Sequence, residues 1–195
     1  LCLAAAPAQP SEQRNVRLVG SKPAMLNPIY GHLRQRAGIA NQRLWIATAY
    51  FLPSWRLRRA LRAAAERGVD VRLLLPGAIT DHPAVRSASH SFYAGLLDAG
   101  VRIFEFQPTF QHAKVSLADD WVSIGSSNFD RWSMARNLEV NLEVEQTEFA
   151  AQTAEMFKHD FARSTEIDLN SWSQRPRAQH WKERILGEIE SWLSR

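Results

Sequence analysis

The chain has 195 residues, of which 45% are hydrophobic and 23% charged, a composition typical of a folded globular protein and unlike that of disordered chains or coiled coils. Its single cysteine, Cys2, excludes an intramolecular disulfide framework and a cysteine-based zinc site. The formal net charge of +4 is unevenly spread, since residues 1–110 hold 14 Lys and Arg against 6 Asp and Glu, whereas residues 111–195 hold 10 against 14. A basic first half suggests an anionic partner such as phosphate, a lipid headgroup or a nucleic acid.

The first 14 residues contain two prolines among small and polar residues and predict a leader or linker. Their apolar start lacks a basic segment and a full hydrophobic run, so it does not form a complete signal peptide. Since the chain also lacks an initial Met, we expect it to be part of a longer protein. No stretch approaches the ~18 apolar residues of a membrane span; the run from Leu44 to Leu52 has nine.

Strand and helix patterns alternate between residues 15 and 106. Apolar segments typical of strands lie at 16–19, 43–50, 69–75 and 101–106, and helical patterns lie at 26–40, 54–68 and 84–99. Asn27-Pro28 marks the start of the first helix, and Ser54 and Gly68 mark the ends of the second. Strands separated by helices of this length indicate βαβ units and a largely parallel sheet.

The helix predicted at residues 54–68 has an apolar face and a basic one. Its apolar residues recur at helical spacing: Leu57, Leu61, Ala64 and Ala65. Its five arginines lie on the other faces: Arg56, Arg58, Arg59, Arg62 and Arg67. Such arginines are typical of the solvated side of a helix, with a contact to an anionic partner as the alternative.

The pattern changes after residue 110. Lys114–Ala118 and Trp121–Ile124 predict two strands joined by a tight acidic turn, and residues 138–144 alternate strictly between apolar and polar. A helix is predicted at 147–162. From residue 177 a second amphipathic helix is predicted, expected to pack on the domain or, alternatively, to lie on a membrane surface; its stripe is Trp181, Ile185, Leu186, Ile189, Trp192 and Leu193.

These patterns predict an α/β fold with a mixed, largely parallel sheet flanked by helices and a C-terminal amphipathic helix. We expect a leader or linker at 1–14, one domain at 15–165 and a helical appendage at 166–195.

The segment from residue 112 to 128 contains the residues that are candidates for catalysis. Side chains two apart on a strand share a face, so His112 and Lys114 are predicted to emerge together, about 6.6 Å apart. A nucleophile or base beside a fixed positive charge suits attack on a phosphodiester, because the cation stabilises the charge added in the transition state. Gly125, Ser126 and Asn128 follow the facing strand, where glycine permits close backbone approach and the polar groups can donate to oxygens.

His-x-Lys, four residues, Asp119, and then Gly-Ser-x-Asn resembles the HKD motif of the phospholipase D superfamily, with five rather than six residues between Asp119 and Gly125. Flanking segments resemble the second half of bacterial cardiolipin synthases, so that the resemblance covers roughly residues 15–160; these segments are 16–20, 48–53, 81–83, 93–100 and 137–141.

This resemblance implies a role for each matching residue. His112 would attack phosphorus to give a phosphohistidine or, as the partner histidine, protonate the leaving alkoxide. Lys114 and Asn128 would hold the non-bridging phosphate oxygens, with Ser126 assisting. Glu139 would hydrogen-bond the histidine ring and fix its tautomer.

The remaining motif residues have structural interpretations. Asp119 fits a contact at the strand end better than a chemical role, Gly125 belongs to the motif, and Asp120 is a simple turn former. Glu139 could instead be a polar residue on a solvent-facing strand. No metal and no cofactor are implied, because Lys and His supply the positive charge.

Other side chains could lie near this site. His82, beside a proline in a loop, is the one other histidine expected near a pocket. Tyr50, Phe51 and Phe110 are expected in the core, with a lipid cleft as the alternative.

Chemistry through a covalent histidine needs a nucleophile and a general acid, and this superfamily supplies them from two HKD motifs. The chain contains one complete motif, so we expect it to be the C-terminal half of a two-motif enzyme, with a homodimer as the alternative.

The resemblance implies a phosphatidyltransferase or phosphodiesterase of the phospholipase D type, closest to a cardiolipin synthase. Its partners would be a phospholipid donor, an alcohol acceptor and a second HKD half, and its place would be peripheral, on the cytoplasmic side of a bacterial membrane. The alternatives are a single-motif homodimeric endonuclease, which would bind nucleic acid, and a non-catalytic module of the same fold.

Overall fold

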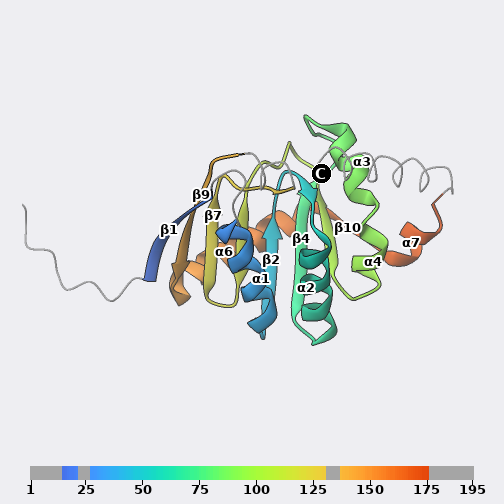
Figure 1. Ribbon diagram of the computed structural model, residues 1–195. Coiled ribbons are helices and arrows are strands. Elements are labelled where there is room, and N and C mark those ends of the chain that lie inside the picture. Colours follow the sequence, from blue (N-terminus) through green and yellow to red (C-terminus); the bar gives the residue numbers. More distant parts are fainter. Residues whose placement is uncertain (1–14, 22–26, 131–136, 176–195) are drawn as a thin grey trace, which may run out of the picture.

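The computed structural model describes residues 15–21, 27–130 and 137–175. They form an eight-stranded sheet in the order β1-β9-β7-β6-β2-β4-β5-β10 and a two-stranded sheet of β3 and β8 (Figure 1). The strands are β1 (Asn15–Ser21), β2 (Arg43–Ala47), β3 (Phe51–Leu52), β4 (Asp70–Pro76), β5 (Arg102–Phe106), β6 (Val115–Ala118), β7 (Trp121–Gly125), β8 (Phe129–Asp130), β9 (Glu139–Glu145) and β10 (Ser164–Ile167). The helices are α1 (Pro28–Ile39), α2 (Trp55–Glu66), α3 (Pro83–His90), α4 (Tyr93–Leu97), α6 (Thr147–Ala162) and α7 (Leu169–Ser173). In the described ranges, no helix combines the length and hydropathy needed to cross a bilayer.

The predicted mixed sheet between helices is confirmed, and its parallel part is narrower than the alternation suggests. In the main sheet β2 pairs with β4, and β4 with β5, in parallel, because helices connect these strands. The other neighbours, including the β6–β7 hairpin, pair antiparallel.

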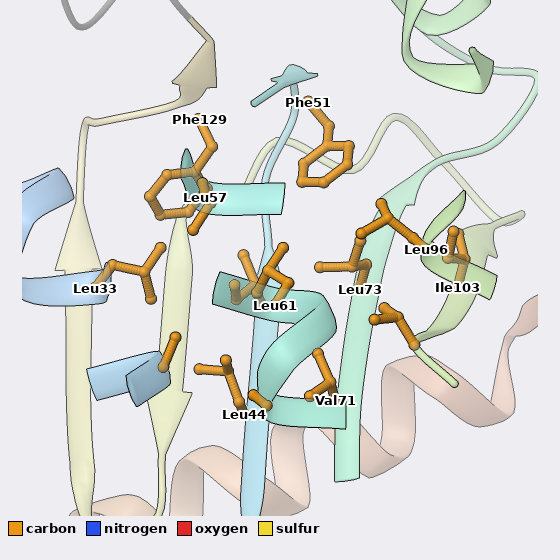
Figure 2. Packing of buried hydrophobic residues seen from close by; sticks show 14 of the residues in the cluster. Leu33, Leu44, Phe51, Leu57, Leu61, Val71, Leu73, Leu96, Ile103 and Phe129 are labelled. Atoms are coloured by element: carbon orange, nitrogen blue, oxygen red, sulfur yellow. The ribbon is translucent and has the colours of Figure 1, made fainter. Parts of the chain in front are cut away.

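The central strand β2 divides its side chains between two cores. Leu44 and Ile46 pack in one cluster with the buried faces of α1 and α2, whereas Trp45 and Ala47 pack with α6 on the other face. Figure 2 shows part of the first cluster, including Leu44. A strand covered on both faces must be apolar throughout, which explains the continuous run in the sequence.

Helix α2 begins and ends close to the predicted residues, 54 and 68. The Ser54 hydroxyl caps it by accepting from the N–H of Leu57 at 3.3 Å, and Gly68 ends the turn with φ +91°. Arg67 is not merely solvated, because its guanidinium donates to the carbonyl of Ala37 at 2.8 Å and so ties α2 to α1.

The single helix predicted at residues 84–99 is two helices, α3 and α4. The hydroxyls of Ser89 and Ser91 donate to the carbonyls of Arg86 and Ala88, each at 2.7 Å. Such local bonds compete with the helical ladder. The chain therefore turns between the two helices at residues 91–92.

The polar face of β9 is the buried one. Glu139, Asn141 and Glu143 are 8%, 3% and 3% exposed, so the interpretation of Glu139 as a solvent-facing residue is wrong. Glu143 is neutralised by Arg17 at 2.6 Å and meets His32 of α1 at 2.8 Å. An apolar residue at position 143 would leave Arg17 without this carboxylate partner.

The part of the predicted appendage that the structure describes belongs to the main body. The expected boundary at residue 165 falls inside β10, which pairs with β5. Trp172 of α7 is buried, with its ring 4.8 Å from that of Tyr93. The predicted leader at 1–14 and the amphipathic stripe after residue 176 lie outside the described residues.

Candidate active site

Strand pairing brings the two parts of the motif to one edge of the sheet. Ala47, the last residue of β2, pairs with Val115 at the start of β6, which in turn pairs with Ile124 near the end of β7. His112 and Lys114 lie just before β6, and Asn128 lies just before β8. The site thus lies beyond the carboxyl end of β2, the edge at which α/β sheets usually bind ligands.

His112 and Lys114 come together as the spacing predicts, although both lie before the strand rather than on it. The ammonium of Lys114 is 3.3 Å from both ring nitrogens of His112 and donates to its backbone carbonyl at 2.8 Å. His112 is exposed, whereas Lys114 is half-buried. An accessible imidazole beside a held cation is the arrangement that attack on a phosphate ester needs.

Asn128 is positioned by a threonine that sequence reasoning missed. Its side chain is 7% exposed, and its Oδ1 lies 3.5 Å from the hydroxyl of Thr48, which is fully buried. The Thr48 hydroxyl also accepts from the N–H of Phe129 at 3.4 Å. Within the described ranges Asn128 Nδ2 has no acceptor, so the amide can donate to a ligand oxygen.

Glu139 reaches the motif through Ser126. The serine hydroxyl donates to Glu139 Oε2, and the Asn137 amide donates to Oε1 at 3.2 Å. Within the described part of the chain, the Glu139 carboxylate makes no hydrogen bond to His112. Here Glu139 therefore orients the serine of the motif, and its contact with the histidine ring stays a prediction.

Three carboxylates surround Lys114 at longer range. Burial lowers the pKa of its ammonium, and Glu139, Asp81 and Asp130 oppose that shift. Asp130 is a second residue that sequence reasoning missed; it is buried on β8, two residues after Asn128. The lysine is thus a charged donor held partly out of water, where its field acts strongly.

Aromatic rings flank the imidazole. The rings of Phe110 and Tyr50 lie 5.2 and 6.2 Å from the ring of His112, and both side chains are half-buried rather than core residues as expected. Phe51 is buried, as predicted.

The Tyr50 hydroxyl donates to Asp81 at 2.7 Å, and burial together with this carboxylate raises the pKa of Tyr50 to about 12. The ring of His82 lies 5.3 Å from that of Tyr50, so this histidine is near the site.

Gly125 permits a close approach, but of a neighbouring strand rather than of a ligand. A Cβ at this position would lie 2.2 Å from the carbonyl oxygen of Val140 and 2.6 Å from the Cα of Asn141. Any side chain would push β9 away from β7. Since Glu139 begins β9, the glycine keeps that carboxylate beside Ser126.

Asp119 lies at the opposite end of β6 from the histidine. Its carboxylate accepts from the backbone N–H groups of Asn41, Gln42 and Arg43 at 2.9–3.0 Å, and its own φ is +49°. Burial opposes ionisation, but these three bonds outweigh it and lower the pKa. Its geometry supports the structural role expected for it.

We therefore expect Asp119→Ala to cost about 2 kcal/mol of unfolding free energy at neutral pH, because it removes three charge-assisted hydrogen bonds. A group with a depressed folded pKa stabilises the protein above its unfolded pKa, so the difference should shrink as pH falls below the usual value of 3.8 through the lowered one, to the smaller cost of placing Ala at a φ of +49°. Urea denaturation of both proteins at several pH values measures this. A difference independent of pH would contradict it.

The fold and the grouping of imidazole, ammonium and amide at one sheet edge define a phospholipase D-like domain. The chain belongs to the family described as cardiolipin synthase, PLD-like domain, whose model matches residues 33–161. The resemblance seen in the sequence is thereby confirmed.

Two relatives give the scale of the similarity. The chain is 44% identical over 147 residues to cardiolipin synthase A of Pseudomonas putida (strain W619), covering 75% of this chain and 30% of that protein. It is 36% identical over 151 residues to the minor cardiolipin synthase ClsB of Bacillus subtilis (strain 168), covering 75% and 38%. The chain thus spans well under half the length of these relatives.

Solved structures with the same fold are more distant in sequence. Nuc from Salmonella typhimurium, a phospholipase D family member, matches with a TM-score of 0.66 at 19% identity over 80% of this chain and 99% of its own. Phosphatidylserine synthase from Haemophilus influenzae Rd KW20 matches with a TM-score of 0.71 at 13% identity over 92% and 47%. At these identities the likeness concerns the fold.

Proposed function

We propose that this chain is one half of a phosphatidyltransferase of the cardiolipin synthase type. The observation that carries the proposal is the exposed imidazole of His112 with the Lys114 ammonium 3.3 Å from its ring nitrogens, in a chain of this family. The reaction moves a phosphatidyl group from one phospholipid to an alcohol, at the surface of a bacterial membrane.

The chemistry proceeds through two displacements at phosphorus. An imidazole nitrogen bonds to phosphorus as the bond to the leaving alkoxide breaks, and a second histidine gives that alkoxide its proton. The acceptor alcohol then gives a proton to the second histidine and attacks phosphorus, and the phosphorus–nitrogen bond breaks. His112 takes one of these two roles.

The other side chains of the site act on the phosphate. The Lys114 ammonium and the Asn128 amide hold its non-bridging oxygens, with the Ser126 hydroxyl assisting. These donors stabilise the charge that builds on oxygen as phosphorus becomes five-coordinate. Glu139 holds Ser126 in place, and its negative charge opposes the lowering of the pKa of Lys114 by burial.

The second histidine comes from another HKD half. The tripeptide His180-Trp181-Lys182 repeats the His-x-Lys spacing, but the following sequence lacks the Asp and the Gly-Ser-x-Asn of a complete motif, and it lies outside the described residues. The length of the relatives supports the N-terminal half of the same enzyme as the source, with a second copy of this chain as the alternative. A complete HKD motif upstream in the open reading frame would decide between them.

The test is to trap the intermediate in the complete enzyme. Phosphatidylglycerol labelled in the phosphatidyl group is mixed with the enzyme, the reaction is quenched with a denaturant at neutral pH, and the digested peptides are searched for a phosphatidyl adduct on histidine. We expect the adduct, followed by transfer of label to an added alcohol. Cleavage of DNA without any lipid product would instead identify an endonuclease, and neither activity would identify a non-catalytic module.

A further inference from the structure

A basic groove lies between α2 and α4, apart from the residues that act on the phosphate. It has a volume of about 670 Å³, within the range of small-ligand sites. In Figure 1 the two helices run side by side in front of the sheet. Its lining from α2 is one stripe at spacings of three and four residues, continued by residues of α4 and the preceding turn: Trp55, Arg58, Arg59, Arg62, Ala63, Glu66, Ser91, Phe92, Gly95 and Leu96.

The positive charge of this groove is poorly neutralised. Arg62 lies 3.9 Å from Glu66, and both are exposed, so their pairing is weak. Within the described ranges, neither Arg58 nor Arg59 has a carboxylate partner. Three arginines facing one glutamate leave an excess that favours an anion with several acceptor oxygens, which the guanidinium fork binds well.

One of these arginines is held in position without a carboxylate. The guanidinium carbon of Arg58 lies 4.4 Å from the centre of the Phe92 ring, and the side chain is half-buried. Burial lowers the pKa of this group, and the hydroxyl of Tyr30 opposes the shift. A stacked, partly desolvated guanidinium is already ordered and loses little entropy when it binds an anion.

The shape and position of the groove favour a lipid as the source of that anion. Phe92 and Ala63, which are both half-buried, add apolar surface beside the arginines, as the junction of a headgroup with its glycerol requires. Trp55, which is 58% exposed, stands at the end of α2 that follows β3, and β3 pairs with β8 directly after Asn128. Exposed tryptophan is typical of membrane interfaces. One lipid surface could therefore reach both this end of the groove and the catalytic edge.

We propose that the groove between α2 and α4 is a second anion site, which binds the phosphodiester headgroup of an anionic phospholipid while the catalytic site acts on another lipid molecule. The choice of a lipid over a soluble phosphate rests on the proposed function, whereas the anion site itself does not.

The test is vesicle binding by the complete enzyme. We compare vesicles of phosphatidylcholine with vesicles of phosphatidylcholine and phosphatidylglycerol in equal parts, and use inorganic phosphate and duplex DNA as competitors. The groove variant is Arg59→Gln/Arg62→Gln. The matched control is Lys158→Gln/Arg163→Gln, which removes the same charge at α6, on the opposite face of the sheet. Both pairs are exposed, so both variants should fold.

We expect the groove variant to bind the phosphatidylglycerol vesicles about 25-fold more weakly, since each arginine near an anionic surface contributes about fivefold. The control should change binding less than about twofold, because its charges are screened from the surface. Equal losses in both variants, or no loss in the groove variant, would overturn the proposal. Displacement of the vesicles by DNA, or by phosphate at low concentration, would overturn the choice of lipid.

A second pair of variants uses the open wall of the groove. A Cβ at Gly95 meets no atom within 4 Å, so Gly95→Ala should leave binding unchanged, whereas Gly95→Glu should weaken it severalfold by placing a carboxylate there. Equal binding by these two variants would count against the groove. The His112→Ala variant separates the two proposals, because it should retain vesicle binding whether or not catalysis depends on that histidine.

Discussion

His112→Ala in the complete enzyme is expected to reduce phosphatidyl transfer by at least about 10⁴-fold, because nucleophile and general acid act as a unit and the loss of either stops the covalent route. The imidazole is exposed and is held by the Lys114 ammonium rather than by core packing. Its removal should therefore leave the melting temperature within a few degrees of the original. Transfer of labelled phosphatidyl group to an alcohol measures the activity, and circular dichroism measures the melting.

The matched control for this substitution is His159→Ala. This histidine is also exposed, but it lies on α6, where its ring nitrogen is 3.4 Å from Asp160. Its loss should leave transfer unchanged. Full activity in His112→Ala would refute the mechanism, whereas loss in both variants would indicate a general effect of removing a surface imidazole.

The sequence allowed the motif to be predicted, but not the residues that hold it. His112 and Lys114 are two positions apart, so their proximity follows from backbone geometry alone. Thr48 and Asp130 reach the site through the pairing of β2 with β6 and of β3 with β8, and no spacing along the chain indicates those pairings. Asp130 did carry one usable signal, since it follows Asn128 by two positions and two-residue alternation would place both on one side.

Alternation identified the two faces of β9 but not which of them is buried. Polar residues usually face water, yet Glu143 is inside because Arg17 and His32 come from β1 and α1 to meet it. Burial of charge depends on partners distant in sequence. In the same way, the alternation of strands and helices predicted an α/β sheet, while the antiparallel strands at its β1 edge became evident only from the register.

Lys114→Met is expected to lower kcat for transfer by about 10²–10³-fold, because a preorganised cation at the phosphate oxygens stabilises the transition state more than the ground state. Met keeps most of the length and the apolar stem, so packing should survive. Lys158→Met is the control, since Lys158 is exposed on α6 and pairs with Glu155 at 2.7 Å. Steady-state assays with both variants measure the difference.

The pH profile gives a readout that a structural role would not change. Burial lowers the pKa of the Lys114 ammonium, so kcat/KM should fall as pH rises through that lowered value, because the neutral amine no longer stabilises the phosphate charge. Lys114→Arg keeps the charge at every pH and should therefore lose this alkaline decline, even if imperfect geometry lowers its maximum rate. A decline that is unchanged in Lys114→Arg would assign the titration to another group and contradict the role of the lysine charge.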